Sequence, residues 1–162
     1  MTPKSVQRLS EWSPCRRRRY RLGRFWEQGP IACVIGLNPS IADDQLDDPT
    51  NRRLLGFLCA QGFGGYWLIN LIPESTPYPE KLGKHTRRLS NKNQSIIQET
   101  VASTETLILA WGAGANRCPF RYELVERFAD PQCFGVTQNG EPKHPLYLPA
   151  HTNLKPFPGY RF

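Results

Sequence analysis

The sequence lacks the cysteine spacings that are typical of disulfide-rich and metal-binding proteins. It contains five cysteines among 162 residues, an odd number, and no two of them form a Cys-x-x-Cys pair. The spacing therefore favours neither a disulfide framework nor a zinc or iron–sulfur site. We expect reduced thiols, no metal and no cofactor, as is typical of a cytosolic protein.

Long apolar segments are absent as well. The first residues contain no apolar stretch like that of a signal peptide, and no run reaches the about eighteen apolar residues that a membrane helix needs. From this we predict a cytoplasmic protein without a membrane span. We also find no internal repeat and no linker, so residues 1–162 are expected to form one domain with a basic N-terminal segment, residues 1–29.

Positive charge is in excess, with 21 Lys and Arg residues against 14 Asp and Glu residues and a formal net charge of +7. This balance predicts a polyanionic partner, with nucleic acid as the first candidate, although a basic protein kept soluble by its charge would show the same balance. The run "CRRRRYRLGRFW" at residues 15–26 interleaves six arginines with three aromatic residues, a combination that can bind phosphates and stack on bases. We expect DNA contacts from Arg16, Arg17, Arg18 and Arg19.

Short apolar runs rich in β-branched residues alternate with amphipathic segments that carry helix start signals. Asp48 precedes Pro49 at the start of one such segment, and Ser90 precedes another. We predict strands at residues 31–37, 65–72, 106–111 and 133–136, and helices at residues 48–62, 90–104 and 119–128. This alternation indicates an α/β fold of three layers, α/β/α, with a central, mainly parallel four-stranded sheet.

Each predicted strand leads into a polar or glycine-containing segment. In an open parallel sheet, ligands bind beyond the carboxyl ends of the strands, so these segments are expected to meet at one site. They contain Gly36, Asn70, Trp111 and His144. The loop at residues 73–89 is long for a compact domain, and we expect it to contact the ligand.

Four motifs occur in this order along the chain: "GLNPS", "WLINLIPEST", "LILAWGAGA" and "KHPLY". The set resembles the motif series of the uracil-DNA glycosylase superfamily, and the resemblance extends over residues 31–149. The acidic turn "ADDQLDDPT" and "HPLY" are also similar to a bacterial and phage family of the same expected fold, to which no activity is assigned. The resemblance implies a uracil-DNA glycosylase-like fold.

In this superfamily, the first motif orients the attacking water, an asparagine after the second strand reads the target base, and a late histidine donates to the base. The resemblance therefore assigns these roles to Asn38, Asn70 and His144. It also implies a substrate pocket that includes Gly36, Leu37, Pro39, Ser40, Trp111 and Gly112. The alternatives are a strand-end cap for the second asparagine, an ordinary surface histidine and a tryptophan that only packs in the core.

Cleavage of an N-glycosidic bond builds positive charge on the sugar and negative charge on the base. Asn38 can hold a water molecule but cannot ionise, so it predicts slower chemistry than an aspartate would give. Asp43 is expected to supply the missing charge, with simple exposure to solvent as its alternative. Asp48 is a second candidate, although a helix cap explains it more simply.

Together these features predict a monofunctional DNA glycosylase that flips a modified pyrimidine out of single- or double-stranded DNA and leaves an abasic site, in antiviral defence or repair. Ser40 stands where uracil-selective members have a tyrosine, so the pocket should accept a larger base, such as the modified bases of phage DNA. Further DNA contacts are expected from Arg52, Arg53, Lys143, Leu146 and Tyr147. A DNA-binding module without activity and a hydrolase or transferase of free nucleosides are the alternatives. We expect a monomer.

Overall fold

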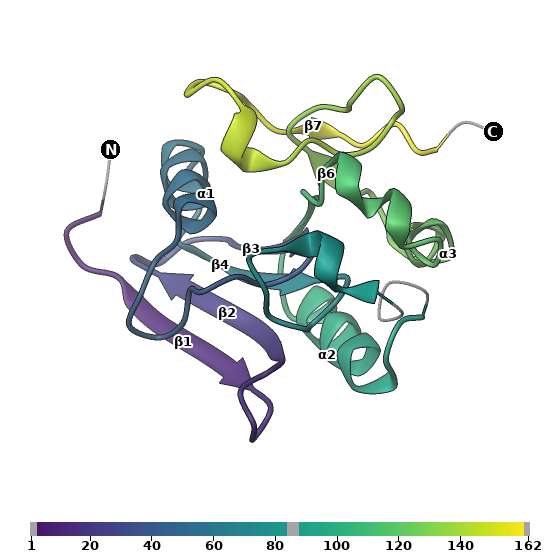
Figure 1. The fold of residues 1–162 in the computed structure, drawn as a ribbon. Helices are drawn as coiled ribbons and strands as arrows, with labels where there is room; N and C mark the ends of the chain where they lie inside the picture. The colour runs from purple at the N-terminus through teal and green to yellow at the C-terminus, as the bar shows by residue number, and fades with distance from the viewer. Residues whose placement is uncertain (1–2, 84–87, 161–162) are drawn as a thin grey trace.

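The computed structural model describes residues 3–83 and 88–160, and its centre is a seven-stranded mixed sheet of order β1-β2-β4-β3-β5-β6-β7 (Figure 1). Four neighbouring strands run parallel: β4 (Gly65–Asn70), β3 (Ile31–Gly36), β5 (Thr106–Leu109) and β6 (Gln132–Cys133). They overlap the four predicted strands, although each is shorter than predicted. The predicted parallel core is confirmed.

Three further strands extend the sheet beyond these four: β1 (Gln7–Trp12), β2 (Arg19–Phe25) and β7 (Lys155–Pro156). β1 and β2 form an antiparallel hairpin, β2 pairs antiparallel with β4, and β7 pairs antiparallel with β6 at the opposite edge. The prediction of a four-stranded sheet was therefore incomplete. The prediction missed β2 because its many arginines make it resemble a surface segment, although its Tyr20 and Leu22 are buried in the core.

The helices are α1 (Pro49–Ala60), α2 (Asn91–Ala102) and α3 (Arg121–Glu126), and short 3-10 helices are η1 (Pro79–Lys81), η3 (Ala113–Arg117) and η4 (Pro145–Tyr147). The carboxylate of Asp48 accepts a hydrogen bond from the backbone nitrogen of Asn51 at 2.8 Å, and the hydroxyl of Ser90 accepts one from Asn93 at 3.2 Å. Both predicted helix caps are confirmed. In the described parts of the chain, no helix has the length and apolar character needed to cross a membrane.

Helices cover both faces of the sheet. Alternate side chains of a strand point to opposite faces. Ala32 and Val34 of β3 belong to the apolar cluster that includes α1, whereas Cys33 and Ile35 belong to the cluster that includes α2 and α3. Figure 1 shows α1 and α2 on opposite sides of the sheet. Burial on both faces explains the continuous apolar run of β3. All five cysteines, Cys33 among them, are free thiols.

The sheet reverses its direction of winding at β3. The chain passes from β3 through α1 to β4 on one side of β3, and then through α2 to β5 on the other side. Connections that leave a central strand in opposite directions open a crevice at the carboxyl ends of the strands, and ligands bind there in α/β proteins. The predicted site lies at this edge.

Candidate functional site

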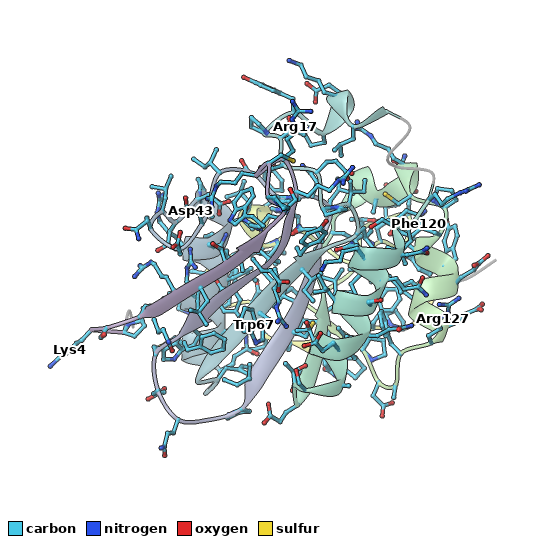
Figure 2. The ribbon with its side chains drawn as sticks, turned by 90° about the horizontal axis from the view of Figure 1, so that it is seen from below. Lys4, Arg17, Asp43, Trp67, Phe120 and Arg127 are labelled. Carbon is cyan, nitrogen blue, oxygen red and sulfur yellow. The ribbon has the colours of Figure 1, made fainter. Side chains whose placement is uncertain are left out.

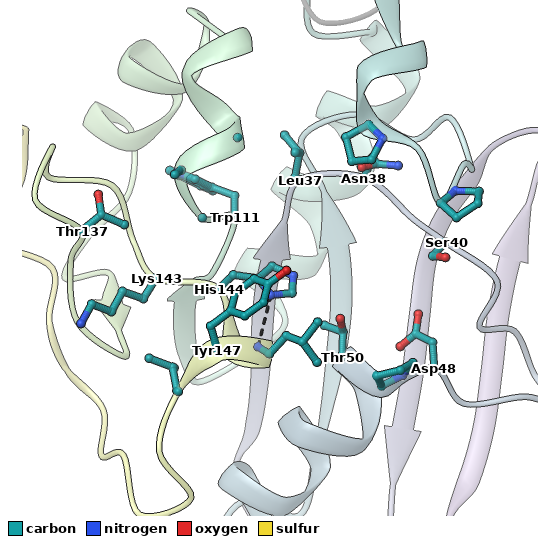
Figure 3. A pocket seen from close by; sticks show the side chains of 18 of the residues that line it. Leu37, Asn38, Ser40, Asp48, Thr50, Trp111, Thr137, Lys143, His144 and Tyr147 are labelled. Carbon is teal, nitrogen blue, oxygen red and sulfur yellow. Dashed lines mark hydrogen bonds between the residues drawn. The ribbon is translucent and has the colours of Figure 1, made fainter.

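A cavity of about 710 Å³, which we call the outer cavity, lies beyond the carboxyl ends of β3 and β5 (Figure 3). Asp48 and Ser40 lie on one side of it, and Trp111 and Lys143 lie on the other. The loop after β4 reaches the cavity through Thr76, whereas its contact with a ligand stays a prediction; residues 84–87 lie outside the described residues. The volume is in the range of small-molecule sites.

A smaller space of about 60 Å³, which we call the inner recess, adjoins the outer cavity. It has room for only a few water molecules. Five residues line both spaces: Asn38, Ser40, Asp48, Thr50 and His144. Gly36, Asn70 and Arg19 line the inner recess without reaching the outer cavity.

The inner recess brings together the three side chains to which the motifs assigned chemistry. Asn38 follows β3, Asn70 ends β4, and His144 precedes η4, so they come from three distant parts of the sequence. The convergence of Asn38 and Asn70 follows from the parallel sheet, because β3 and β4 end side by side at Gly36 and Asn70, whereas His144 comes from the long connection after β6. The geometry therefore permits all three side chains to act on one bound group.

Asn38 is held by its amide nitrogen. Nδ2 donates to the backbone oxygens of Pro39 at 3.0 Å and Thr76 at 2.8 Å. Since both amide protons are used, Oδ1 is the atom that remains to accept a hydrogen bond, and no described residue donates to it. Pro39 itself is buried and lines neither space.

Asn70 is buried at the end of β4, against a glycine. A Cβ atom at Gly36 would lie 3.0 Å from Nδ2 of Asn70, so any larger residue at this position would push the amide out of its observed position. Oδ1 of Asn70 accepts a hydrogen bond from Nη2 of Arg19 at 3.5 Å, and Nδ2 of Asn93 donates to the backbone oxygen of Asn70 at 2.8 Å. The Asn70 amide is thus oriented from behind, with Nδ2 available to the recess.

His144 has a defined tautomer. Its Nδ1 accepts a hydrogen bond from the backbone nitrogen of Leu146 at 3.2 Å, so the neutral ring carries its proton on Nε2 and can donate from there (Figure 3). Burial lowers the pKa of His144, and the Asp48 carboxylate opposes this effect only in part. Gly112, with a φ of 75°, makes room for the histidine, because a Cβ atom there would lie 3.0 Å from the Cβ of His144.

Asp48 lines the same recess as Asn38, Asn70 and His144. One carboxylate oxygen, Oδ1, accepts from both the backbone nitrogen and Nδ2 of Asn51, which leaves Oδ2 without a donor among the described residues. Asp48 is the only carboxylate among the described residues that line either space. The sequence indicated its cap function but not that Asp48 lines the same cavities as Asn38 and His144.

Trp111 belongs to the core and to the cavity wall. Its Nε1 donates to Oε2 of Glu141 at 2.9 Å, and the same carboxylate accepts from Nε of Arg121 at 2.8 Å and from the Tyr160 hydroxyl at 2.8 Å. The predicted core packing of Trp111 is confirmed, and this buried network also holds its ring in the wall of the outer cavity.

Asp43 lies away from both spaces. Its Oδ1 accepts from the backbone nitrogens of Gln45 and Leu46 at 2.8 Å each, and these bonds, assisted by Arg16 and Arg24, hold the pKa of Asp43 below its usual value. Its predicted catalytic role is therefore corrected: the carboxylate closes a turn. Figure 2 shows it on the loop beside the N-terminal hairpin.

The predicted run of DNA-binding arginines divides into surface and interior residues. Arg16, Arg17 and Arg18 are exposed in the turn between β1 and β2, where Arg17 marks the tip of the hairpin (Figure 2). Arg19 is only 2% exposed, so its predicted contact with DNA phosphates is wrong. Arg24, also within the run, is completely buried and binds Asp47 at 2.7 Å. The acidic turn after the first motif thus folds around arginines of β2.

The remaining predicted DNA contacts differ in exposure. Arg52 is exposed in the first turn of α1, whereas Arg53 is half-buried, donates to the backbone oxygen of Leu148 and lies over the ring of Phe57. The rim of the outer cavity is formed in part by Lys143, Leu146 and Tyr147. Leu146 and Tyr147 are 37% and 84% exposed.

The fold and this edge define an α/β protein with a small recess that adjoins a larger cavity at the switch point of its sheet, and both polar and apolar residues line the recess. The chain belongs to the family described as "Protein of unknown function (DUF1643)", which matches residues 19–146. The match includes every segment that lines the inner recess. No curated protein and no solved structure matches the chain, so the resemblance to the uracil-DNA glycosylase superfamily stays a prediction. Within the described residues, no group of three or more His, Cys, Asp or Glu side chains could hold a metal ion.

Proposed function

We propose that the protein is a monofunctional DNA glycosylase of the uracil-DNA glycosylase type, which hydrolyses the N-glycosidic bond of a flipped-out modified pyrimidine and leaves an abasic site. The observation that supports this most is the meeting of Asn38, Asn70 and His144 in one recess. They provide an acceptor for water, an amide for the base edge and a neutral imidazole donor, which are the groups this reaction needs.

The proposed reaction uses each group once. Oδ1 of Asn38 accepts a hydrogen bond from the attacking water, and Oδ2 of Asp48 lies opposite the positive charge that develops on the sugar. Nε2 of His144 donates to a carbonyl oxygen of the base as negative charge gathers there. Asn70 binds the edge of the base. Asp48 thus supplies the charge that Asn38 lacks, and the role first given to Asp43 passes to it.

The surroundings of the recess support a flipped, enlarged base as the substrate. The inner recess is too small for a ring, so the base would lie in the outer cavity with one edge towards the recess. Ser40 leaves this side of the cavity open, and Trp111 offers an aromatic wall. At the rim, the exposed Leu146 and Tyr147 are placed to fill the gap that a flipped nucleotide leaves in the duplex.

A glycosylase assay tests the proposal. The folded protein, in excess, is incubated with oligonucleotides containing plain and 5-substituted pyrimidines and with modified phage DNA, and heating in alkali then breaks the strand at abasic sites. We expect breaks with at least one modified pyrimidine. Absence of abasic sites on all substrates contradicts the proposal.

A pair of variants tests the role of Asp48. Asp48→Asn keeps a good helix cap but removes the charge, so we expect about 10²- to 10³-fold slower excision, with some loss of thermal stability because the carboxylate favours the buried Arg19 cation. Asp44→Asn is the matched control, because Asp44 is an exposed carboxylate of the same turn that lines neither space. Equal excision rates for both variants would show that Asp48 only caps α1.

A further inference from the structure

The inner recess contains a buried cation that the motif series does not explain. Arg19 lines the recess beside Asn70 and is 2% exposed. It reaches this position because β2 bulges: Glu11 pairs with Arg21 and Trp12 pairs with Arg19, so Tyr20 is an extra residue in the strand. The bulge turns the guanidinium towards the recess.

Arg19 is less well paired than the other buried arginine of β2. Nη1 donates to the backbone oxygen of Ala42 at 2.9 Å and Nη2 to Oδ1 of Asn70 at 3.5 Å, while Nε has no partner among the described residues. Arg24, in contrast, forms an ion pair with Asp47 at 2.7 Å and donates to the backbone oxygens of Gly23 and Asp43.

A buried charge without a counter-ion is costly, and it points to a ligand that brings the opposite charge. Among the described residues, no carboxylate forms an ion pair with Arg19. Burial lowers the pKa of Arg19 to about 10, an effect that the nearby Asp48 carboxylate opposes, so the group stays cationic at neutral pH. Asp48 is a nearby negative charge but forms no hydrogen bond or ion pair with Arg19, so the guanidinium can still respond to negative charge on a bound ligand.

We propose that Arg19 is a positioning residue that acts through Asn70 to stabilise the negative charge on the departing pyrimidine. This inference rests on the proposed glycosylase function. In this proposal the guanidinium, whose Nη2 lies 3.5 Å from Oδ1 of Asn70, orients the amide so that Nδ2 faces the base and polarises it as a donor. The recess therefore selects a pyrimidine that presents a carbonyl oxygen to it and can leave as an anion.

The charges balance in this scheme. The bond between C1′ and N1 breaks, and its electron pair passes to the base and spreads onto the carbonyl oxygen that faces the recess. The oxygen of water bonds to C1′ and releases one proton to the solvent. The base takes up a proton when it leaves the cavity. Asp48 and Arg19 then lie on the sugar side and the base side of the same bond.

A series of leaving groups tests the inference. Excision rates are measured for oligonucleotides whose 5-substituted uracils differ in the acidity of N1, with the wild-type protein, Arg19→Gln and Arg19→Lys. We expect Arg19→Gln to slow excision of the least acidic base by about 10²-fold and that of the most acidic base by less than about tenfold. Arg19→Lys, which retains the charge, should recover most of this difference.

Arg24→Lys is the matched control, because Arg24 is equally buried on the same strand but lines neither space. We expect lower thermal stability and an unchanged dependence on the leaving group. If Arg19→Gln slows all substrates by one factor, the residue is merely structural and the inference is overturned.

A binding measurement separates this inference from the proposed function. Calorimetric titration with a free uracil whose N1 ionises near neutral pH, at pH values on both sides of that ionisation, should show about tenfold tighter binding of the anion to the wild-type protein. Arg19→Gln should lose this preference, and Arg19→Lys should keep it. An anion preference without excision of any substrate would refute the glycosylase function alone, whereas excision without an anion preference would refute the role of Arg19.

Discussion

The amide of Asn38 donates to two backbone oxygens, those of Pro39 and Thr76, and so ties the first motif to the loop after β4. An aspartate at this position would place a carboxylate oxygen against the two carbonyl oxygens. In place of the faster chemistry that the sequence predicts for an aspartate, we therefore expect that Asn38→Asp lowers the free energy of unfolding by about 1–3 kcal/mol and does not speed excision. Urea denaturation and the glycosylase assay measure the two effects. Asn139→Asp, in an exposed turn, is the control, and a stable, faster Asn38→Asp variant would contradict this view.

His144 makes a pH-dependent contribution to stability. Burial lowers the pKa of His144 in the folded protein below the usual value of 6.5. Well above pH 6.5, the imidazole is therefore neutral in both the folded and the unfolded protein. As the pH falls from there through the lowered folded pKa, the unfolded chain binds a proton before the folded chain does, and stability is lost.

We predict that His144→Asn, which cannot take up this proton, loses less thermal stability than the wild type between about pH 7.5 and pH 5. Differential scanning calorimetry across this range measures the difference. An equal loss in both proteins would show that burial of the imidazole does not contribute. NMR titration of the ring, assigned with the variant, provides an independent value of the folded pKa.

The connection that leaves β5 depends on one backbone conformation. Gly112 has φ 75° and ψ −177°, a combination that is essentially restricted to glycine, and its nitrogen donates to the backbone oxygen of Pro142 at 2.9 Å. This contact joins the end of β5 to the segment that carries His144. The site therefore depends on how two connections pack against each other.

We predict that Gly112→Ala costs about 1–3 kcal/mol of stability and displaces His144, so that excision is largely lost. Gly140→Ala is the matched control: its φ of 83° is equally positive, but an added Cβ atom meets nothing within 4 Å. The control should lose stability and keep its excision rate. Thermal denaturation and the glycosylase assay distinguish the two variants, and equal activity would remove the proposed link between Gly112 and His144.

The N-terminal hairpin is part of the sheet and cannot be treated as a detachable DNA-binding arm. Arg24 and Arg8 both bind Asp47, at 2.7 Å each, and so connect β1 and β2 to the acidic turn before α1. Deletion of residues 1–24 would remove β1 and almost all of β2, and it would expose the edge of β4 and the apolar side chains that β2 covers. Neutral substitutions at the exposed hairpin tip are the appropriate test of DNA binding.

We predict that Arg16→Gln with Arg17→Gln weakens DNA binding equally for all sequences and reduces the slope of log affinity against log salt by about 1 for each phosphate that these arginines neutralise. Arg127→Gln is the control, since Arg127 is exposed at the end of α3, away from the hairpin tip (Figure 2). Fluorescence anisotropy at several salt concentrations measures the slope. An unchanged slope would show that these two arginines do not contact DNA. If the double variant hydrolyses free nucleosides as fast as the wild type does, the alternative of a nucleoside hydrolase is favoured.

Local sequence was sufficient for the parallel core, for both helix caps and for the meeting of Asn38 and Asn70 at one edge, whereas the position of His144 depends on the packing of the connection after β5 against the segment after β6. A continuous apolar run indicates a strand that is buried on both faces, and a helix cap binds a backbone group only three residues away. Both features can therefore be recognised in short stretches of sequence. Once the strands are parallel and ordered, their ends must lie side by side.

Packing between distant segments decided the rest. β2 reads as a basic surface run because its buried arginines find their partners some twenty or more residues away, at Ala42, Asp47 and Asn70. Arg19 faces the recess because the hairpin contains a bulge, and no residue in the sequence indicates that a bulge forms there. Tertiary structure also decides that Asp48, which the sequence marks only as a helix cap, lines the recess. Ion pairs and cavities depend on three-dimensional neighbours, and the energy of a buried charge is set by those neighbours and not by its place in the chain.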